Sequence, residues 1–213
     1  MGKKQNFGTI LNMLGTLTMV MGGLLILPVF FALSIGEYEV IDSFLISAGL
    51  ALLIGTIFKI SFKHDKVSFK ESLLICGLSW IILCLFAGLP FYFETGVSFL
   101  DSYFETVSGF TTTGITIFTN IEELARSIIL WRSFTQWLGG LGIITFFLAI
   151  SFGANTGSYH LLSAESHKID STRLTPSVKK TALILWGVYL GLSIIQIFTL
   201  RILGMSFFDS VNH

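Results

Sequence analysis

The residues from Thr111 to Thr116, Thr-Thr-Thr-Gly-Ile-Thr, are of the types that can hold a desolvated cation. Rings of backbone carbonyls can replace the hydration shell of a potassium ion. Threonine favours extended backbone, and Gly114 can reach conformations that direct successive carbonyls to one side. We expect an ion-filter strand of Thr111, Thr112, Thr113, Gly114 and Ile115, with Thr112 and Thr113 as potassium ligands. The alternative interpretation is a polar turn between helices.

The residues before this segment predict a short helix that would support it. Phe99 to Ser108 is helical in character but too short to cross a membrane, and Asp101 and Ser102 suit a helix N-terminus. The following stretch to Thr119 disfavours helix. A short helix followed by extended backbone, entering and leaving on one face, is a re-entrant loop. Irregular backbone at membrane depth is tolerated where it lines a cavity or is buried in protein, so this stretch predicts a pore.

The composition places these residues in a membrane. Apolar residues make up 53% of the 213-residue chain and charged residues 12%, whereas a soluble domain carries about a quarter charged residues. Five segments are apolar over about the 20 residues that a spanning helix needs: 7–34, 40–58, 72–92, 128–152 and 181–203. We expect an all-α integral membrane protein with a pore helix and a filter loop. Nothing indicates an enzyme, a cofactor or a nucleic acid partner.

The basic residues predict the orientation. Ten of the 13 lysines and arginines lie before the first segment, between the second and third, or between the fourth and fifth. The positive-inside rule assigns these stretches to the cytoplasm. We therefore expect a cytoplasmic N-terminus and a re-entrant loop that opens to the outside.

The chain also contains an internal repeat. Gly96-Val-Ser-Phe-Leu-Asp-Ser recurs 108 residues later as Gly204-Met-Ser-Phe-Phe-Asp-Ser, with five of seven positions identical. Such repeats in membrane chains indicate a site built from pseudo-symmetric units. The second copy stops at His213, before its own filter segment, so we expect a truncated chain. One strand cannot encircle an ion, and we expect no selective pore from this chain alone.

Two longer motifs carry a family resemblance. Ser108-Gly-Phe-Thr-Thr-Thr-Gly-Ile-Thr and Trp131-Arg-Ser-Phe-Thr-Gln-Trp-Leu-Gly-Gly-Leu-Gly-Ile-Ile resemble the TrkH subunit family of bacterial Trk potassium uptake, within the TrkH/KtrB/HKT superfamily. The similarity runs from about Ser68 to the end of the chain. The two leading helices favour the TrkH type over the KtrB type.

The resemblance implies two leading helices followed by four repeats of helix, pore loop and helix. Residues 1–66 would be the leading pair, 67–165 the first repeat and 166–213 the start of a second. It also implies potassium transport across the bacterial cytoplasmic membrane, with the family's filter glycine at Gly114. The implied partners are membrane lipid, a second copy of the full-length protein and the cytosolic nucleotide-binding subunit TrkA. Rival hypotheses are a symporter of another monovalent cation and a non-conducting fragment or assembly subunit.

Other residues have simpler interpretations. Gln136 bonds either to the back of the filter or to a neighbouring helix. Asp101 and Asp209 suit N-capping, and Glu94 and Glu105 have no partner that would suggest catalysis. Close helix packing is expected at Gly139, Gly140, Gly142, Gly187 and Gly191. A solvated surface is expected at His64, His160 and His167. Cys76 and Cys84 are expected to be buried thiols that form no disulfide.

The orientation is testable by cysteine labelling. A cysteine at Glu39 is expected to react with an impermeant reagent from outside the cell, and a cysteine at Lys66 is expected not to react. The reverse labelling pattern would contradict the assignment of the basic loops to the cytoplasm.

Overall fold

The computed structural model describes residues 7–63, 65, 67–165 and 178–213. All regular elements in these ranges are helical, which confirms the predicted all-α class. They are α1 (Phe7–Leu24), α2 (Ile26–Ile35), α3 (Ile41–Ser61), α4 (Phe69–Thr95), α5 (Phe99–Phe110), the 3₁₀ turn η1 (Ile121–Glu123), α6 (Arg126–Glu165), α7 (Val178–Ile202) and α8 (Phe207–Asn212).

The chain forms two compact units, Met1–Gly139 and Gly140–His213, which divide inside α6. This boundary follows packing, whereas the predicted boundaries after residues 66 and 165 follow the family resemblance and stay predictions. The first unit contains α1 to α5 and the start of α6. The second contains the rest of α6 with α7 and α8.

Four helical stretches in the described residues are long and apolar enough to cross a membrane: Phe7–Ile35, Ile41–Ser61, Lys70–Thr95 and Lys180–Ile202. Each coincides with a predicted segment, and the chain is a multi-pass membrane protein. The remaining predicted segment, 128–152, lies within α6. The described side chains of α6 end at Thr145, so its crossing stays a prediction.

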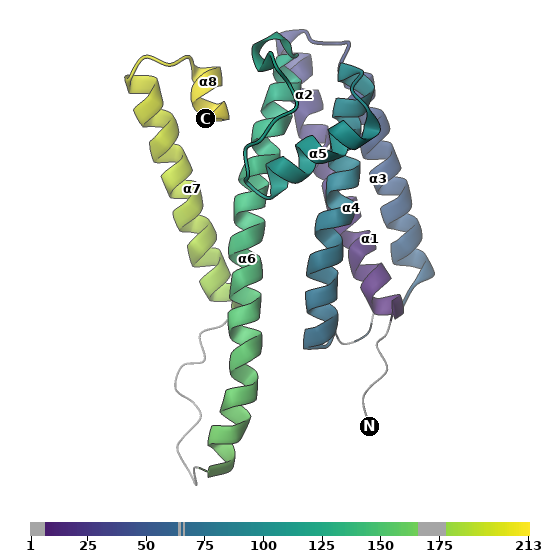
Figure 1. Ribbon diagram of the computed structural model, residues 1–213, viewed down its shortest axis with the longest axis vertical. Helices are drawn as coiled ribbons and strands as arrows, with labels where there is room; N and C mark the ends of the chain where they lie inside the picture. The colour runs from purple at the N-terminus through teal and green to yellow at the C-terminus, as the bar shows by residue number, and fades with distance from the viewer. Residues whose placement is uncertain (1–6, 64, 66, 166–177) are drawn as a thin grey trace. The chain divides into compact units, whose positions relative to one another are not determined.

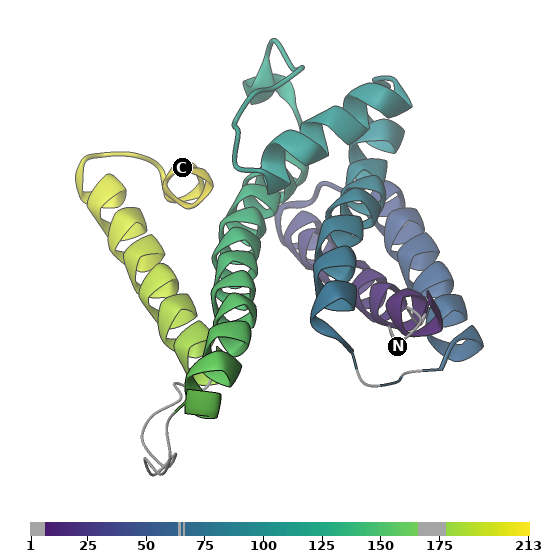
Figure 2. The same cartoon turned by 60° about the horizontal axis from the view of Figure 1, so that its bottom comes forward.

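The leading helices α1 and α3 pack through glycine. A methyl carbon placed on Gly15 would lie 2.7 Å from the Gly55 carbonyl oxygen, and one on Gly55 would lie 2.8 Å from the Gly15 carbonyl oxygen. The two backbones therefore meet directly, as small residues allow in membranes. Asn12 on α1 also donates to the carbonyls of Lys59 and Phe62 at the end of α3. Figures 1 and 2 show α1, α3 and α4 side by side.

Trp131 joins three helices of the first unit. Its side chain is fully buried, and its indole Nε1 donates to the Ala87 carbonyl on α4 at 2.8 Å. Its ring meets Phe44 of α3 edge to face, with ring centroids 6.2 Å apart. Buried aromatic groups of this size contribute large contact areas, and the indole N–H requires a partner when buried. Trp131 thereby places the start of α6 against α3 and α4.

In the structure, each copy of the sequence repeat forms the start of a helix, α5 in the first copy and α8 in the second. Gly96 and Gly204 both have positive φ, 69° and 100°. Ser98 and Ser206 then cap α5 and α8 by accepting from the backbone N–H of Asp101 and Asp209, each at 3.1 Å. The capping residues are thus the serines, and each aspartate is at the third helical position, where it accepts from the serine hydroxyl. The predicted N-cap role of the aspartates is corrected accordingly.

Glu37, in the loop between α2 and α3, caps the N-terminus of α6. Its two carboxylate oxygens accept from the backbone N–H groups of Arg126 at 2.9 Å and Ser127 at 3.0 Å, and from the Ser127 hydroxyl at 2.8 Å. The first N–H groups of a helix have no partner inside the helix, and negative charge is favoured there. The leading helices therefore hold the start of α6.

Replacing Glu37 with alanine removes this cap. We expect a loss of about 0.5–2 kcal/mol in the free energy of unfolding, measured as a lower thermal midpoint of the detergent-solubilised chain. Glu39→Ala, on the same loop at an exposed position, is the matched control and should leave the midpoint unchanged. Equal midpoints for the two variants would contradict the capping role of Glu37.

Candidate functional site

The short helix α5, which was predicted to be a pore helix, and the segment that follows it form a re-entrant shape. Figure 1 shows α5 starting near the end of α4 and the chain after it returning to that same end, where η1 and α6 begin. α5 has 12 residues, too few to cross a membrane. Residues 111–120 contain no helix or strand. This arrangement confirms the predicted short helix followed by irregular backbone.

The backbone of α5 is in close contact with α4 and α6. A methyl carbon on Gly88 of α4 would lie 2.8 Å from the Thr106 hydroxyl oxygen, and one on Gly109 of α5 would lie 2.5 Å from the Thr135 hydroxyl oxygen. A methyl carbon on Gly139 of α6 would collide with the Phe110 carbonyl. The C-terminal end of α5 is therefore fixed between two long helices by positions that have no room for a side chain.

α5 ends in a Schellman motif. The N–H of Thr113 donates to the Ser108 carbonyl at 3.0 Å and the N–H of Thr112 to the Gly109 carbonyl at 2.9 Å, the two bonds that define this helix end. Thr112 has φ 55°, where glycine is usual and a β-branched residue is strained by about 1–2 kcal/mol. Extended backbone was expected at the threonines, but the helix end forces Thr112 into the left-handed region.

Gly114 also has positive φ, 76°, which confirms the predicted conformation that is costly for any residue with a Cβ. Thr111 to Ile115 are all exposed. Among the described residues, none donates a hydrogen bond to the carbonyls of Thr112, Thr113 or Gly114. The hydroxyl oxygens of Thr111 and Thr113 are 2.8 Å apart and share a hydrogen bond. Three consecutive carbonyls are therefore free on the exposed part of this irregular segment, residues 111–120, which is called the strand below although it pairs with no other strand.

The Ile115 carbonyl is engaged differently. It accepts a hydrogen bond from the Ser108 hydroxyl at 2.5 Å, and Ser108 is buried on α5. This bond ties the strand to the helix immediately after Gly114. The free carbonyls thus lie between the helix end at Thr112 and the bond at Ile115.

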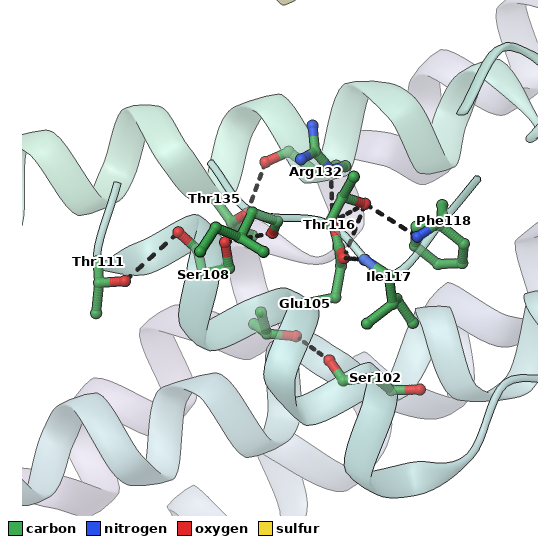
Figure 3. Close-up of polar contacts among 11 residues, drawn as sticks. Ser102, Glu105, Ser108, Thr111, Thr116, Ile117, Phe118, Arg132 and Thr135 are labelled. Carbon is green, nitrogen blue, oxygen red and sulfur yellow. Dashed lines mark hydrogen bonds and ion pairs between the residues drawn. The ribbon is translucent and has the colours of Figure 1, made fainter. Parts of the chain in front are cut away.

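A second set of bonds holds the strand at the next two residues, Thr116 and Ile117. Glu105, 1% exposed, accepts from the Thr116 hydroxyl and from the Ile117 N–H, each at 3.0 Å. Arg132 of α6 forms an ion pair with the same carboxylate, with Nε and Oε1 2.5 Å apart. Figure 3 shows side chains from α5, from the return segment (residues 111–120) and from α6 converging on Glu105. A buried carboxylate requires such partners.

Residues 41–209 match the TrkH family of cation transport proteins. The chain belongs to the TrkH family. It is 31% identical to the Trk system potassium uptake protein TrkH of Escherichia coli K12, over 98% of this chain and 44% of that protein. It is 28% identical to an uncharacterized cation transporter of Methanocaldococcus jannaschii, again over 98% of this chain and 44% of that protein.

A solved structure agrees with this assignment. The crystal structure of the potassium transporter TrkH from Vibrio parahaemolyticus matches 98% of this chain and 42% of that chain, with a TM-score of 0.79 and 28% identity. The chain therefore spans less than half the length of the relatives it matches. Over that stretch, it shares the helical arrangement of the TrkH structure.

The sequence interpretation missed the role of Glu105 and Arg132 in this TrkH-family chain. Both are charged residues in helices of a membrane protein, Arg132 within a mainly apolar stretch of α6 and Glu105 in the short, more polar α5, and charged residues in such helices mark functional or paired positions. That pattern was the available signal, but it does not identify the partner. Gln136, which was expected behind the filter or between helices, has its Cγ 3.9 Å from the Cβ position of Gly109. It therefore lies beside the end of the pore helix.

The other interpretations have mixed outcomes. Close packing is confirmed at Gly139 and at Gly140, where a methyl carbon would lie 2.5 Å from the Tyr189 hydroxyl oxygen. It is not found at Gly187 and Gly191, where a methyl carbon would have no heavy atom of the described residues within 4 Å. Both cysteines are free; Cys84 is buried as predicted, whereas Cys76 is only half-buried. His64, His160 and His167 lie outside the described side chains, and the described part of the chain holds no group of three metal-ligating residues.

Gly139→Ala is expected to lower the thermal midpoint of the purified chain. Its Cβ would meet the Phe110 carbonyl, so the end of the pore helix must move, at a cost of about 1–3 kcal/mol. Gly187→Ala, also inside a helix but in open space, is the matched control and should leave the midpoint unchanged. A Gly139→Ala variant as stable as Gly187→Ala would contradict the close contact of α6 with α5.

Proposed function

We propose that the chain forms the leading helices and first pore repeat of a potassium transporter. Residues Thr111 to Ile115 are proposed as one strand of its ion filter, with Thr112 and Thr113 as potassium ligands. The observation that carries this proposal is the run of three free carbonyls between two fixed points. A cation site built from backbone needs carbonyls that make no internal hydrogen bond. The names of the relatives, Trk system potassium uptake protein and potassium transporter TrkH, support potassium as the ion.

The proposed site is incomplete with one strand. A ring of carbonyls around an ion requires several strands, and the proposed contribution of the described residues is the single strand 111–115. The relatives are more than twice as long as the stretch they share with this chain. The remaining strands are proposed to come from further repeats of the complete pore.

The setting of this pore is part of the proposal. The concentration of lysine and arginine in three of the connecting stretches supports a cytoplasmic N-terminus. The family resemblance supports the bacterial inner membrane as the location. The free carbonyls would then face an entry from the outside, where α5 begins. A second copy of the full-length protein and a cytosolic regulatory subunit of the TrkA type are the proposed partners. The basic cytoplasmic loops are the proposed contacts for the regulatory subunit.

A hybrid transporter tests the function. The region of E. coli TrkH that this chain matches is replaced by residues 1–213, and the hybrid is expressed in a strain that lacks potassium uptake. Growth at low potassium and rubidium uptake above the empty vector are the expected results. A hybrid that reaches the membrane but moves sodium alone would favour the rival symporter, and one that moves neither ion would contradict the proposed function.

Gly114→Ser in the hybrid tests the filter assignment. Its φ of 76° makes any side chain there cost about 1–3 kcal/mol, and the strain should tilt one carbonyl out of the ring. The preference for potassium over sodium is expected to fall while uptake continues through the other strands. Gly36 has a similar positive φ, 81°, and open space around it. Gly36→Ser is therefore the matched control and should leave the preference for potassium over sodium unchanged. Unaltered preference in Gly114→Ser with intact uptake would exclude Gly114 from the filter.

A further inference from the structure

We propose that Glu105 and Ser108 are positioning residues that set the ion preference of the filter strand, although neither touches the ion. This inference rests on the proposed function, since it concerns the same strand. The two residues are three positions apart on α5, so they share one helix face. Both are buried, and both direct a side chain to the return segment rather than to another helix alone (Figure 3).

The bonds follow one another along the strand. Ser108 holds the carbonyl of Ile115, and Glu105 holds the hydroxyl of Thr116 and the N–H of Ile117. The Thr116 hydroxyl also accepts from the Phe118 N–H at 3.2 Å. Residues 115, 116 and 117 are therefore each bonded to a side chain of α5, and residue 118 is bonded to the Thr116 hydroxyl. The last free carbonyl, on Gly114, is one residue away from the first of these bonds.

Only a carboxylate meets these demands at position 105. It accepts the strand N–H and hydroxyl while an ion pair with Arg132 compensates its charge. The side chains of Glu105 and Arg132 are 0% and 14% exposed, so neither charge is well solvated. Removing one partner of such a pair leaves an unpaired buried charge. Arg132 therefore keeps Glu105 able to accept, and α6 is coupled to the strand through this carboxylate.

Ion preference depends on where the carbonyls lie. A binding constellation works when its groups stay within about 0.5 Å of the productive geometry and their supports are themselves locked by hydrogen bonds. The strand from 111 to 120 has no ladder of its own, so side chains must supply this rigidity. Loss of one bond is expected to let the Gly114 carbonyl shift, and sodium, the smaller ion, then competes better.

The alternative is that these residues only hold α5 against α6 and have no effect on the ion preference, a role called the brace below. Two variants separate the roles, because they remove strand bonds and leave the ion pair of Glu105 and Arg132 intact. Ser108→Ala removes the bond to Ile115, and Thr116→Val removes the hydroxyl at nearly constant volume. Ser47→Ala and Thr18→Val are matched controls: both hydroxyls are buried and donate to carbonyls of their own leading helices, Ser43 and Leu14.

The experiment measures rubidium uptake with sodium as competitor in the hybrid transporter. Ser108→Ala and Thr116→Val are each expected to lower the potassium-over-sodium preference about two- to tenfold, the range that the loss of one net hydrogen bond produces. Uptake itself and the thermal midpoint should change little. Glu105→Gln, which keeps one acceptor oxygen but leaves Arg132 unpaired, should lower the preference further. The two controls should match the parent hybrid.

The outcomes are distinguishable. Normal uptake with an unchanged preference in both Ser108→Ala and Thr116→Val overturns this inference and leaves the proposed function standing. A lower thermal midpoint in these variants with unchanged preference assigns the residues to the brace and also overturns it. A parent hybrid that takes up no potassium overturns the proposed function, and the role in ion preference with it.

Discussion

The structure of the first unit depends on one constraint: backbone without secondary structure must be held rigid while some of its carbonyls stay free. Irregular backbone at membrane depth is tolerated only inside protein or beside a cavity. In this chain the strand after α5 meets that constraint through side chains. The buried carboxylate of Glu105 accepts from the strand, and Arg132 of α6 supplies the opposite charge. Without this pair, the strand would lose its link to α6 and would keep only its bonds to α5, such as the one from the Ser108 hydroxyl to the Ile115 carbonyl.

The surrounding helices are arranged to bring these groups together. Gly88 and Gly139 let α4 and α6 approach α5 closely, and Trp131 fixes the start of α6 through the Ala87 carbonyl. The stretch from Trp131 to Gly139 spans about two and a half helical turns. It contains a buried aromatic side chain, the arginine that pairs with Glu105 and a glycine with no room for a Cβ. This combination explains why a motif that is apolar in character contains arginine and glycine.

The leading helices contribute indirectly. They carry no residue of the proposed filter strand, yet Glu37 caps α6 and Phe44 meets Trp131. Their own packing relies on the direct contact of Gly15 with Gly55, which needs little side-chain ordering. A rigid leading pair of this kind holds the start of α6, and α6 in turn carries the arginine that supports Glu105.

Local properties of the sequence were enough to predict the class, the extent of four membrane helices, the short helix before residue 111 and the positive φ of Gly114. These properties are apolar length, helix-start residues and the conformational freedom of glycine. Three features could be learned only from the packed structure: the left-handed conformation of Thr112, the pairing of Glu105 with Arg132, and the packing contact at Gly139 that Gly187 lacks. These depend on partners 27 or more residues away or on how a helix end closes. Residue type states that a buried charge needs a partner, but only the packing of α5 against α6 selects which one.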